Sequence, residues 1–438
     1  MQPNVFFVKK SEISGRIDPD FYQTEYIELE KKIRQKSQKN LYHFAINMAS
    51  GGTPSVDEPS YYSDEVNGIP FLRVQNLTTK GILDLTGLKY ISREVHESML
   101  KRSQFNDQDL LIKITGVGRM AIASVPPLGF SGNTNQHMIV MKTGNRKISE
   151  YLANYLNLNI VEKLAKRRCT GGTRPALDYT ALRSIPVIEG LDFSAWEQAK
   201  KQAEAKLAQA ATLSGSIQAY LLRELGIVVP QVDNALNKRI FTVSTEQLDN
   251  RIDPLFYFHQ ENKMSAGKFE NVPLGKIATL DKGTSLNSGS VIDGDYPVIA
   301  GGQTSPYNHY VYNFSGENIT VSASGAYSGY VWFHDYPIFA SDCTVVKGKD
   351  EQEILTKFLY EVMKLKQEEI YRLRKGAVQP HVYAVDLEKI QIPLPPLDKQ
   401  RAIVAHIAQI RAQIAALQQD AANLLADTQR EMEHLILG

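Results

Sequence analysis

The sequence predicts an α+β protein in which two β-rich domains are each followed by a long helix, with the two helices paired antiparallel and the molecule approximately two-fold symmetric. Three observations support this fold class. One motif occurs twice in the 438 residues, both halves contain short β-branched segments, and a stretch of heptad-spaced apolar residues follows each half. The predicted domains are residues 1–190, 191–235, 236–395 and 396–438.

The motif RIDP-x-FY marks the start of each half. Val5–Tyr22 matches Ile240–Tyr257, with six identities in the seven positions of the motif. The ends of the halves also match, because Thr170–Val187 aligns with Leu373–Pro393 and pairs Pro175 with Pro380. A repeat of this kind indicates two copies of one domain. Asp18 and Asp253 precede prolines in the motif, where a turn is the expected role.

Short apolar segments separated by Gly, Pro, Asn and Ser predict strands in both halves. In the first half they are Ile69–Leu77, Asp109–Thr115 and His137–Lys142, and in the second half they are YPVIAGG, NITVSASG, GYVWF and CTVVKG. Each half also contains one amphipathic stretch that predicts a helix with a basic end, Ser149–Arg168 and Glu351–Lys375.

Two long helices are predicted after the β-rich halves. Asp192–Gly226 is rich in Ala, Gln and Leu, with Ser194 as a candidate N-cap and Gly226 as the stop. Asp398–Leu435 contains no proline or glycine. Its apolar residues recur in steps of four and three, which predicts a seam against another long helix. This seam consists of Ile403, Ile407, Ile410, Ile414, Leu417, Ala421, Leu424, Thr428 and Leu435.

The composition is that of a globular protein and argues against a metal cluster or a disulfide framework. A hydrophobic content of 43% and a charged content of 22% are typical of a globular domain. The net charge of +1 argues neither for nor against nucleic acid, since a basic face can be offset elsewhere. Cys169 and Cys343 are too few for a metal cluster or a disulfide framework, and they suit a reducing compartment. The start of the chain has no signal-peptide pattern, so we expect a cytoplasmic protein.

No catalytic motif emerges from the chain. It contains no P-loop, no HExxH, no Gly-x-Ser-x-Gly and no Asn/Asp-Pro-Pro-Tyr box of amino-methyltransferases. Gly116, Gly118 and Ala121 form a GxGxxA pattern, but the following segment, AIASVPPLGFSG, cannot form the helix that a dinucleotide site needs. We therefore expect a turn between strands there. His381 follows Pro380, and a surface or packing role is expected for it.

The repeated RIDP-x-FY, the turns GGTRP and GAVQP before L-x-x-IP, and the helix entry PLPPLDKQRAIV together resemble the DNA-specificity subunit of type I restriction-modification systems. The resemblance covers the whole chain. It implies that each β-rich half is a target recognition domain for one half of a bipartite DNA site. It also implies that the paired helices set the spacing and dock two methyltransferase subunits, to which restriction subunits can be added.

The resemblance further implies a non-catalytic chain without a cofactor or metal of its own. S-adenosylmethionine would be bound by the methyltransferase, and ATP and Mg²⁺ by a restriction subunit. The predicted helices, about 50 and 57 Å long, exceed one turn of duplex DNA, roughly 34 Å. Two domains at this separation would contact separate groove segments of double-stranded DNA.

Polar and basic residues in the loops are the candidates for DNA contact, because base edges and phosphates are bound by such side chains. A solvated loop or strand face is the alternative for each. The candidates in the first half are Arg73, Gln75, Asn76, Thr78, Lys80, Lys113, Thr115, Arg119, Lys166, Arg167, Arg168, Thr173 and Arg174. Those in the second half are Gln303, Thr304, Ser305, Tyr307, Ser322, Ser324, Tyr327, Arg372, Arg374, Lys375 and Gln379.

Three alternatives stay open at this stage. The chain could be the recognition subunit of a two-subunit type II restriction-modification enzyme, or a stand-alone DNA-modifying enzyme with an unrecognised site. It could also be a coiled-coil adaptor that binds only protein or glycan. Methylation of DNA by the isolated chain would support the second, and failure to retain duplex DNA would support the third.

Overall fold

The computed structural model describes residues 7–10, 13, 15–172, 174–230, 235, 240–248, 254–261, 264–376 and 378–438. The chain divides into two compact units. Unit 1 consists of Met1–Glu204 with Ala421–Gly438, and unit 2 consists of Ala205–Asp420. Each unit thus combines one β-rich half with segments of both long helices. The predicted α+β class, with two β-rich parts and two long helices, is confirmed.

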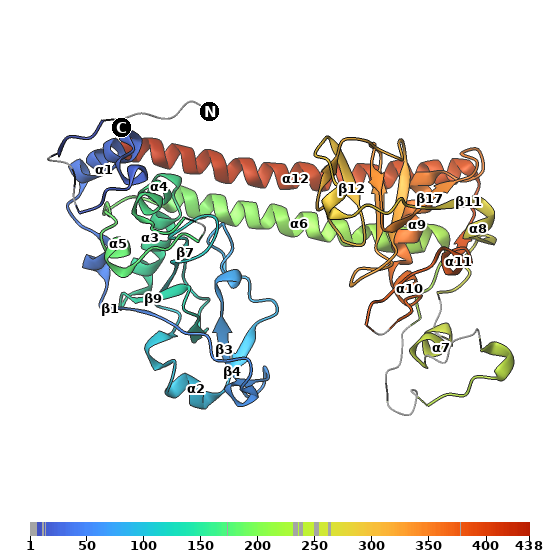
Figure 1. Ribbon diagram of the computed structural model, residues 1–438, viewed down its shortest axis with the longest axis horizontal. Helices are drawn as coiled ribbons and strands as arrows, with labels where there is room; N and C mark the ends of the chain where they lie inside the picture. Colours follow the sequence, from blue (N-terminus) through green and yellow to red (C-terminus); the bar gives the residue numbers. More distant parts are fainter. Residues whose placement is uncertain are drawn as a thin grey trace. The chain divides into compact units, whose positions relative to one another are not determined.

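Unit 1 is built on two small sheets covered by helices. A four-stranded antiparallel sheet has the order β1-β9-β6-β7, and a five-stranded sheet has the order β2-β4-β3-β8-β5. The helices α1, α3, α4 and α5 lie together next to the first sheet (Figure 1). The bounds are α1 Thr24–Lys36, β1 Asn47–Ser50, β2 Tyr62–Ser63, β3 Ile69–Leu72, β4 Lys89–Ile91, α2 Arg93–Glu97, β5 Gln104–Phe105, β6 Leu110–Lys113, β7 Ala123–Ser124, β8 Gly132–Thr134, β9 Met138–Lys142, α3 Arg146–Leu156, α4 Asn159–Arg168 and α5 Tyr179–Arg183.

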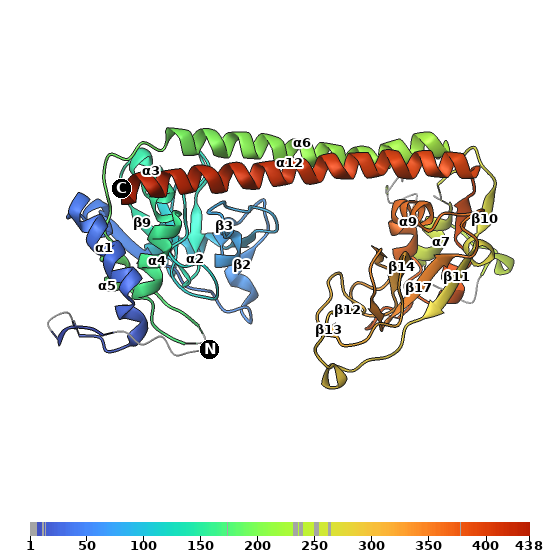
Figure 2. The same ribbon diagram turned by 90° about the horizontal axis from the view of Figure 1, so that it is seen from above.

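Unit 2 repeats this topology. Its four-stranded sheet has the order β11-β17-β14-β15, and α9 packs against β14 and β15 (Figure 2). In both units one parallel strand pair lies outside this sheet, β3 with β8 and β12 with β16. The bounds are α7 Pro254–Glu261, β10 Asn271–Pro273, α8 Leu274–Ile277, β11 Ala278–Lys282, β12 Tyr296–Ile299, β13 Asn308–His309, β14 Asn318–Ser322, β15 Val331–His334, β16 Phe339–Ala340, β17 Cys343–Gly348, α9 Thr356–Leu365, α10 Gln367–Tyr371, α11 Ala384–Leu387 and β18 Gln391–Pro393.

The long helices are α6, Ser194–Leu225, and α12, Leu397–Leu437. Within unit 2 they run antiparallel, since Lys206 Nζ lies 3.0 Å from Asp420 Oδ2 and the rings of Tyr220 and His406 lie 4.2 Å apart. Within unit 1 the start of α6 and the end of α12 contribute to one apolar core with the sheet and its helices. Both helices were predicted almost to the residue, and Gly226 ends α6 with φ +66°.

At the C-terminal end of α12 the buried residues differ from those predicted for the seam. Leu435 is 75% exposed, whereas Met432 and Ile436 are buried. The buried positions after Thr428 follow in steps of four, which keeps one helix face against unit 1. The prediction continued the heptad spacing of a seam between two helices, but this end of α12 packs against a domain core.

The two amphipathic helices predicted inside the halves are each broken in two. In unit 1 the break falls at Asn157, whose side-chain amide exchanges hydrogen bonds with the backbone of Ala123 in β7. In unit 2 it falls at Lys366, and the side chain of the next residue, Gln367, bonds the backbone of Gly329 and Val331. An amide side chain thus ties each break to the neighbouring hairpin.

Candidate nucleic-acid interface

A tight turn joined to a strand end recurs in both units and forms the frame of the candidate site. In unit 1 the turn 170–176 is closed by a bridge between Thr170 and Ala176, and Ala176 also bridges to Thr115 at the end of β6. In unit 2 the bridges join Lys375 with His381 and His381 with Ser324. We call 170–176 and 375–381 the frame turns.

Matching hydrogen bonds show that the two frame turns are equivalent. Gly116 N donates to Pro175 O at 3.1 Å, and Gly325 N donates to Pro380 O at 3.0 Å. Each frame turn also contains one glycine with a backbone that disfavours other residues, Gly171 at φ +87° and Gly376 at φ +99°. A Cβ at either glycine would lie 2.8 Å from a carbonyl oxygen across its turn. The predicted repeat of these segments is therefore a structural repeat.

The RIDP motif fastens the N-terminal segment to the end of α4, directly before the unit 1 frame turn. Arg16 pairs with Asp18 at 2.7 Å and donates to the carbonyl oxygens of Arg168 and Cys169, each at 3.0 Å, at the end of α4. The paired Arg16 guanidinium lowers the pKa of Asp18, mainly through its hydrogen bonds to the carboxylate. Arg16 thus caps carbonyl groups at the C-terminal end of α4, and the expected architectural role of Asp18 agrees with this geometry. Asp253 lies outside the described residues.

Aromatic contacts in the two motifs are also alike. The rings of Phe21 and Tyr22 meet edge to face at 5.0 Å, and those of Phe256 and Tyr257 meet edge to face at 5.1 Å. Tyr22 and Tyr257 are buried. The motif therefore serves packing in both copies.

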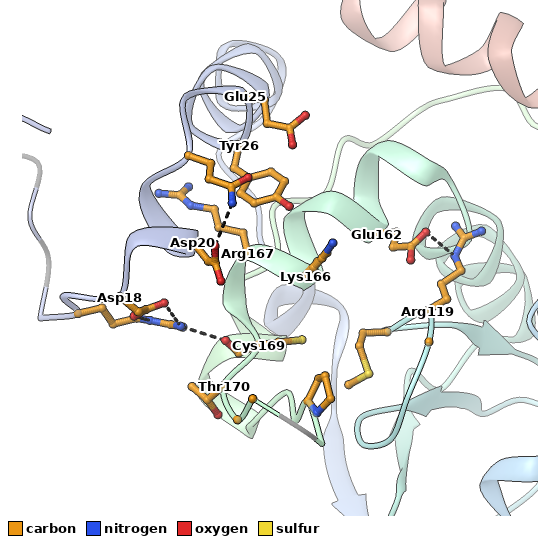
Figure 3. A pocket seen from close by; sticks show the side chains of 17 residues that line it. Asp18, Asp20, Glu25, Tyr26, Arg119, Glu162, Lys166, Arg167, Cys169 and Thr170 are labelled. Atoms are coloured by element: carbon orange, nitrogen blue, oxygen red, sulfur yellow. Dashed lines mark hydrogen bonds and ion pairs between the residues drawn. The ribbon is translucent and has the colours of Figure 1, made fainter. Parts of the chain in front are cut away.

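A groove of about 950 Å³ lies between the RIDP segment, the end of α4 and the frame turn of unit 1 (Figure 3). Its walls carry charges of both signs, including Asp18, Glu25, Arg119 and Lys166. The carboxylates offset the cations, so the groove as a whole is not a basic channel. Among the described residues, no group of three or more His, Cys, Asp or Glu side chains could hold a metal ion.

The basic end of α4 separates into exposed and internal side chains. Lys166 is exposed. Arg167 and Arg168 both pair with Glu30, at 2.5 and 2.7 Å, and Arg168 is only 7% exposed. Burial raises the pKa of Glu30, but the guanidinium groups, Arg168 first, more than offset this and lower it. Substituting Arg167 or Arg168 would therefore disturb the fold together with any contact to DNA.

Two further cations near the frame turn, Lys113 and Arg119, also have partners inside unit 1. Lys113 is buried, donates to Val117 O at 2.8 Å, and has a pKa lowered by burial. Arg119 lies 3.3 Å from Glu162 and donates to the backbone of Asn157. Gly116 and Gly118 have positive φ in the turn between β6 and β7, as predicted for the GxGxxA pattern.

Three further candidates of unit 1 lie at the frame turn itself. The backbone of Thr115 forms a bridge with the frame turn. Arg174 is exposed on the turn. Thr173 lies outside the described residues.

The polar run after β3 forms a compact loop. Asn76 is buried and bonds the backbone at Arg73 and Asp84. Thr78 Oγ1 accepts from Ile82 N at 3.1 Å. Gln75 and Lys80 are exposed. The loop thus uses its smaller polar side chains for its own shape and leaves Gln75 and Lys80 facing solvent.

In unit 2 the polar candidates lie on two loops beside the frame turn. Ser305 donates to Val298 O in β12 and to Tyr307 O, and Ser322, at the end of β14, donates to Gly302 O in the loop after β12. Ser324 donates to Asp342. The exposed side chains on these loops are Gln303, Thr304, Tyr307 and Tyr327.

The basic cluster of unit 2 lies at the frame turn. Arg374 donates to Ser328 O at 2.8 Å and lies over the ring of Tyr371, and Lys375 pairs with Asp386 at 2.7 Å. Arg372 is partly exposed. Gln379 is exposed at the position equivalent to Arg174.

The two β-rich units thus carry equivalent frame turns, with exposed polar and basic side chains beside each. None of the helices within the described ranges combines the length and apolar character that crossing a membrane requires.

Comparison with known proteins indicates the family that this chain resembles. Residues 266–425 match the family model described as the type I restriction modification DNA specificity domain. A putative type I specificity subunit from Mycoplasma pneumoniae is 25% identical over 143 residues, which are 31% of this chain and 45% of that protein. The aligned part thus spans about half of the relative's length. Over these residues the chain is similar to type I restriction-modification specificity subunits, as the sequence motifs indicated.

Two solved S-subunit structures match this chain over most of its length. The type I restriction-modification S subunit from M. genitalium is 12% identical with a TM-score of 0.43, and the match covers 88% of this chain and 92% of that one. The HsdS subunit from Thermoanaerobacter tengcongensis is 14% identical with a TM-score of 0.33, covering 89% and 96%.

Proposed function

We propose that the chain is the sequence-specific DNA-recognition and scaffold subunit of a type I restriction-modification complex, with each unit recognising one half of a bipartite site. The observation that carries this proposal is the duplicated frame, in which equivalent backbone positions bear different side chains. Arg174 and Gln379 are equivalent and exposed, and a guanidinium and an amide bind different groups on DNA. Two similar frames with different polar groups suit two different half-sites.

The partners follow from the same proposal. We infer that exposed faces of α6 and α12 dock two methyltransferase subunits, with restriction subunits added where they exist. Most side chains along α12 are exposed, which leaves ample surface for a partner. The chain itself would be non-catalytic and would bind no cofactor, while S-adenosylmethionine, ATP and Mg²⁺ would be bound by the partners. The family match favours this over a two-subunit type II enzyme or a stand-alone modification enzyme.

Mapping of adenine methylation in cells with and without the gene would test the proposed function. We expect a bipartite sequence, methylated only when this chain is present, with two defined half-sites and a fixed number of unspecified base pairs between them. Methylation that is unchanged on deletion would contradict the proposal. Methylation of DNA by the purified chain alone, with S-adenosylmethionine, would instead support the stand-alone enzyme.

The same mapping can test whether the helices set the spacing. We propose inserting about four residues, close to one helical turn and about 6 Å of rise, into both α6 and α12. We expect both half-sites to be kept and the unspecified spacer to lengthen. A control with four conservative substitutions on exposed positions of the same helices should keep the original spacer. An unchanged spacer in a folded, active insertion variant would refute the ruler role.

A further inference from the structure

The residue that precedes the central strand occupies one equivalent position in both units. In unit 1 it is His137, whose carbonyl oxygen accepts from Ile114 N at 3.0 Å, and in unit 2 it is Asp342, whose carbonyl oxygen accepts from Ala323 N at 3.1 Å. The strands that follow have the same register, because Met138 pairs with Lys113 and Cys343 with Ser322. The frame therefore places a histidine and an aspartate at the same point beside the frame turns.

Asp342 lies where the three segments of the unit 2 surface converge. Its carboxylate accepts a hydrogen bond from Ser324 Oγ, and Ser324 bridges to His381 of the frame turn. A Cβ at Gly301, in the loop that carries Gln303, would lie 2.6 Å from Ser324 O and 3.2 Å from Asp342 Oδ2. Only a glycine backbone allows this approach. The carboxylate is exposed and is oriented by Ser324.

The stretch of chain around Asp342 contains no lysine or arginine that could neutralise its carboxylate. Gly283–Val346, which runs from the end of β11 into β17, contains no lysine or arginine. Within the described part of the chain, Asp342 forms no ion pair with the neighbouring basic cluster either. Lys375 pairs with Asp386, and Arg374 donates to Ser328.

An ionised carboxylate can only accept hydrogen bonds. A carboxylate that faces DNA without a neighbouring cation is repelled by the phosphates. It is therefore tolerated at a position where an exocyclic amino group of a base can donate a hydrogen bond to it. On the major-groove edge that group is N4 of cytosine or N6 of adenine. Guanine and thymine present oxygen acceptors at the corresponding positions, which a carboxylate repels.

We propose that Asp342 is a specificity-determining residue of unit 2, where it selects a base with an exocyclic amino group, and that His137 holds the equivalent position in unit 1. This inference rests on the proposed function, because it presupposes that unit 2 contacts base edges. Ser324 acts as the positioning residue, since it fixes the orientation of the carboxylate. Selection arises mainly by rejection of bases that carry an acceptor.

The test uses the assembled complex with its methyltransferase subunits and compares wild type with Asp342→Asn. The amide has both a donor and an acceptor, so discrimination at one base pair of the unit 2 half-site should fall about tenfold to a hundredfold. Binding to duplexes with guanine or thymine at that pair should increase, while binding to the preferred duplex changes less. The unit 1 half-site should stay the same. Ser324→Ala should reduce the discrimination at the same base pair by a smaller factor.

Asp335→Asn is the matched control. It removes the same charge from the same Lys- and Arg-free region, but Asp335 follows His334, which pairs with Asn318 at the opposite end of β14. It should leave both half-sites unchanged. Unaltered discrimination in Asp342→Asn, or equal weakening of all sequences, would overturn the inference. If wild type showed no sequence preference at all, the proposed function would fail instead, so the two failures are distinguishable.

Discussion

The two units build the same frame, but they cover it with regions of very different charge. From Gly51 to Met141 unit 1 contains basic residues, namely Arg73, Lys80, Lys89, Arg93, Lys101, Arg102, Lys113 and Arg119. The topologically equivalent region of unit 2, Gly283–Val346, contains none. Backbone bridges and glycines keep the frame, while the side chains around it differ. The comparison indicates that the backbone frame and the chemistry of the side chains around it can vary separately in this chain.

The difference extends into the interior. Arg168 of unit 1 is buried and bonded to Glu30 and Ser184. The sequence repeat aligns it with Leu373, which packs against the apolar core of unit 2. One unit therefore holds the end of its helix with an internal ion pair, and the other with apolar contacts.

Arg168→Leu should have the largest effect on stability. It places in unit 1 the leucine that unit 2 has at this position, but without the apolar surroundings of Leu373. Removing one partner of a buried ion pair leaves the other charge poorly compensated, and we expect unit 1 to lose about 3 kcal/mol of stability. Hydrogen exchange of the amides in α1 and α4 measures this loss locally. Unit 2 amides should keep their protection.

Lys166→Leu is the control for Arg168→Leu, since its side chain is exposed and should change stability by less than about 0.5 kcal/mol. The double variant Glu30→Leu/Arg168→Leu should recover much of the loss, because an apolar pair can replace a buried ion pair. Equal protection of α4 in wild type and Arg168→Leu would show that the ion pair does not hold this helix.

The sequence predicted the fold well where the signal is local. The heptad spacing located α6 and α12, and the repeat located both frame turns. The helix breaks at Asn157 and Lys366 were missed because the amides that secure them bond strands distant in the chain. Likewise, Arg168 looked like a phosphate ligand because its partner, Glu30, is 138 residues away.

The candidate site was only partly predictable. Lys80, Gln303 and Tyr327, which were named as candidates for DNA contact, are exposed, and whether they contact DNA stays a prediction. His137 and Asp342 were missed as candidates. Their equivalence appears only in the strand register, which places Cys343 opposite Ser322 as Met138 lies opposite Lys113. Aligning the two strand sequences by register would have found the pair.

Acidification should distinguish the units in a second way. His334 of unit 2 is fully buried beside Thr320, and burial lowers its pKa from 6.5 to about 4. Because the folded pKa is lower than the unfolded one, the unfolded state binds the proton first. The stability that neutral His334 gives to unit 2 is complete above pH 6.5 and is lost as pH falls toward 4. Between pH 7 and pH 5 we expect unit 2 to lose about 2 kcal/mol.

Unit 1 should respond less over this range and mainly at lower pH. Burial also lowers the pKa of His137, but this side chain is only partly buried, whereas His334 is fully buried. The pKa of Glu30 is lowered in the folded state, so its contribution persists above the unfolded value, about 4.3, and is lost below it. Hydrogen exchange of both sheets at pH 7 and 5 measures the difference. His334→Gln, which can still bond Thr320 but does not titrate, should remove the pH dependence in unit 2. Equal loss in both units would contradict this assignment.

The smallest expected effect concerns salt, and it tests the charge difference directly. Lys80→Gln with Lys166→Gln removes two exposed cations of unit 1, whereas Gln303→Ala with Tyr327→Phe changes unit 2 without altering charge. Each lost phosphate contact should reduce the slope of log K against log salt by about 0.9. The first pair should therefore flatten the slope by roughly 1.8, and the second should leave it unchanged.

The measurement is binding of the assembled complex to its cognate duplex between about 50 and 200 mM salt, the range in which counterion release is pronounced. Lys31→Gln, which changes an exposed lysine on α1 of unit 1, is the matched control for the loss of positive charge. A slope that falls equally in the control would mean that net charge, and not contact at the unit 1 surface, sets the salt dependence. A slope that falls with the neutral substitutions of unit 2 would show that its surface also releases counterions, through the cations of its frame turn.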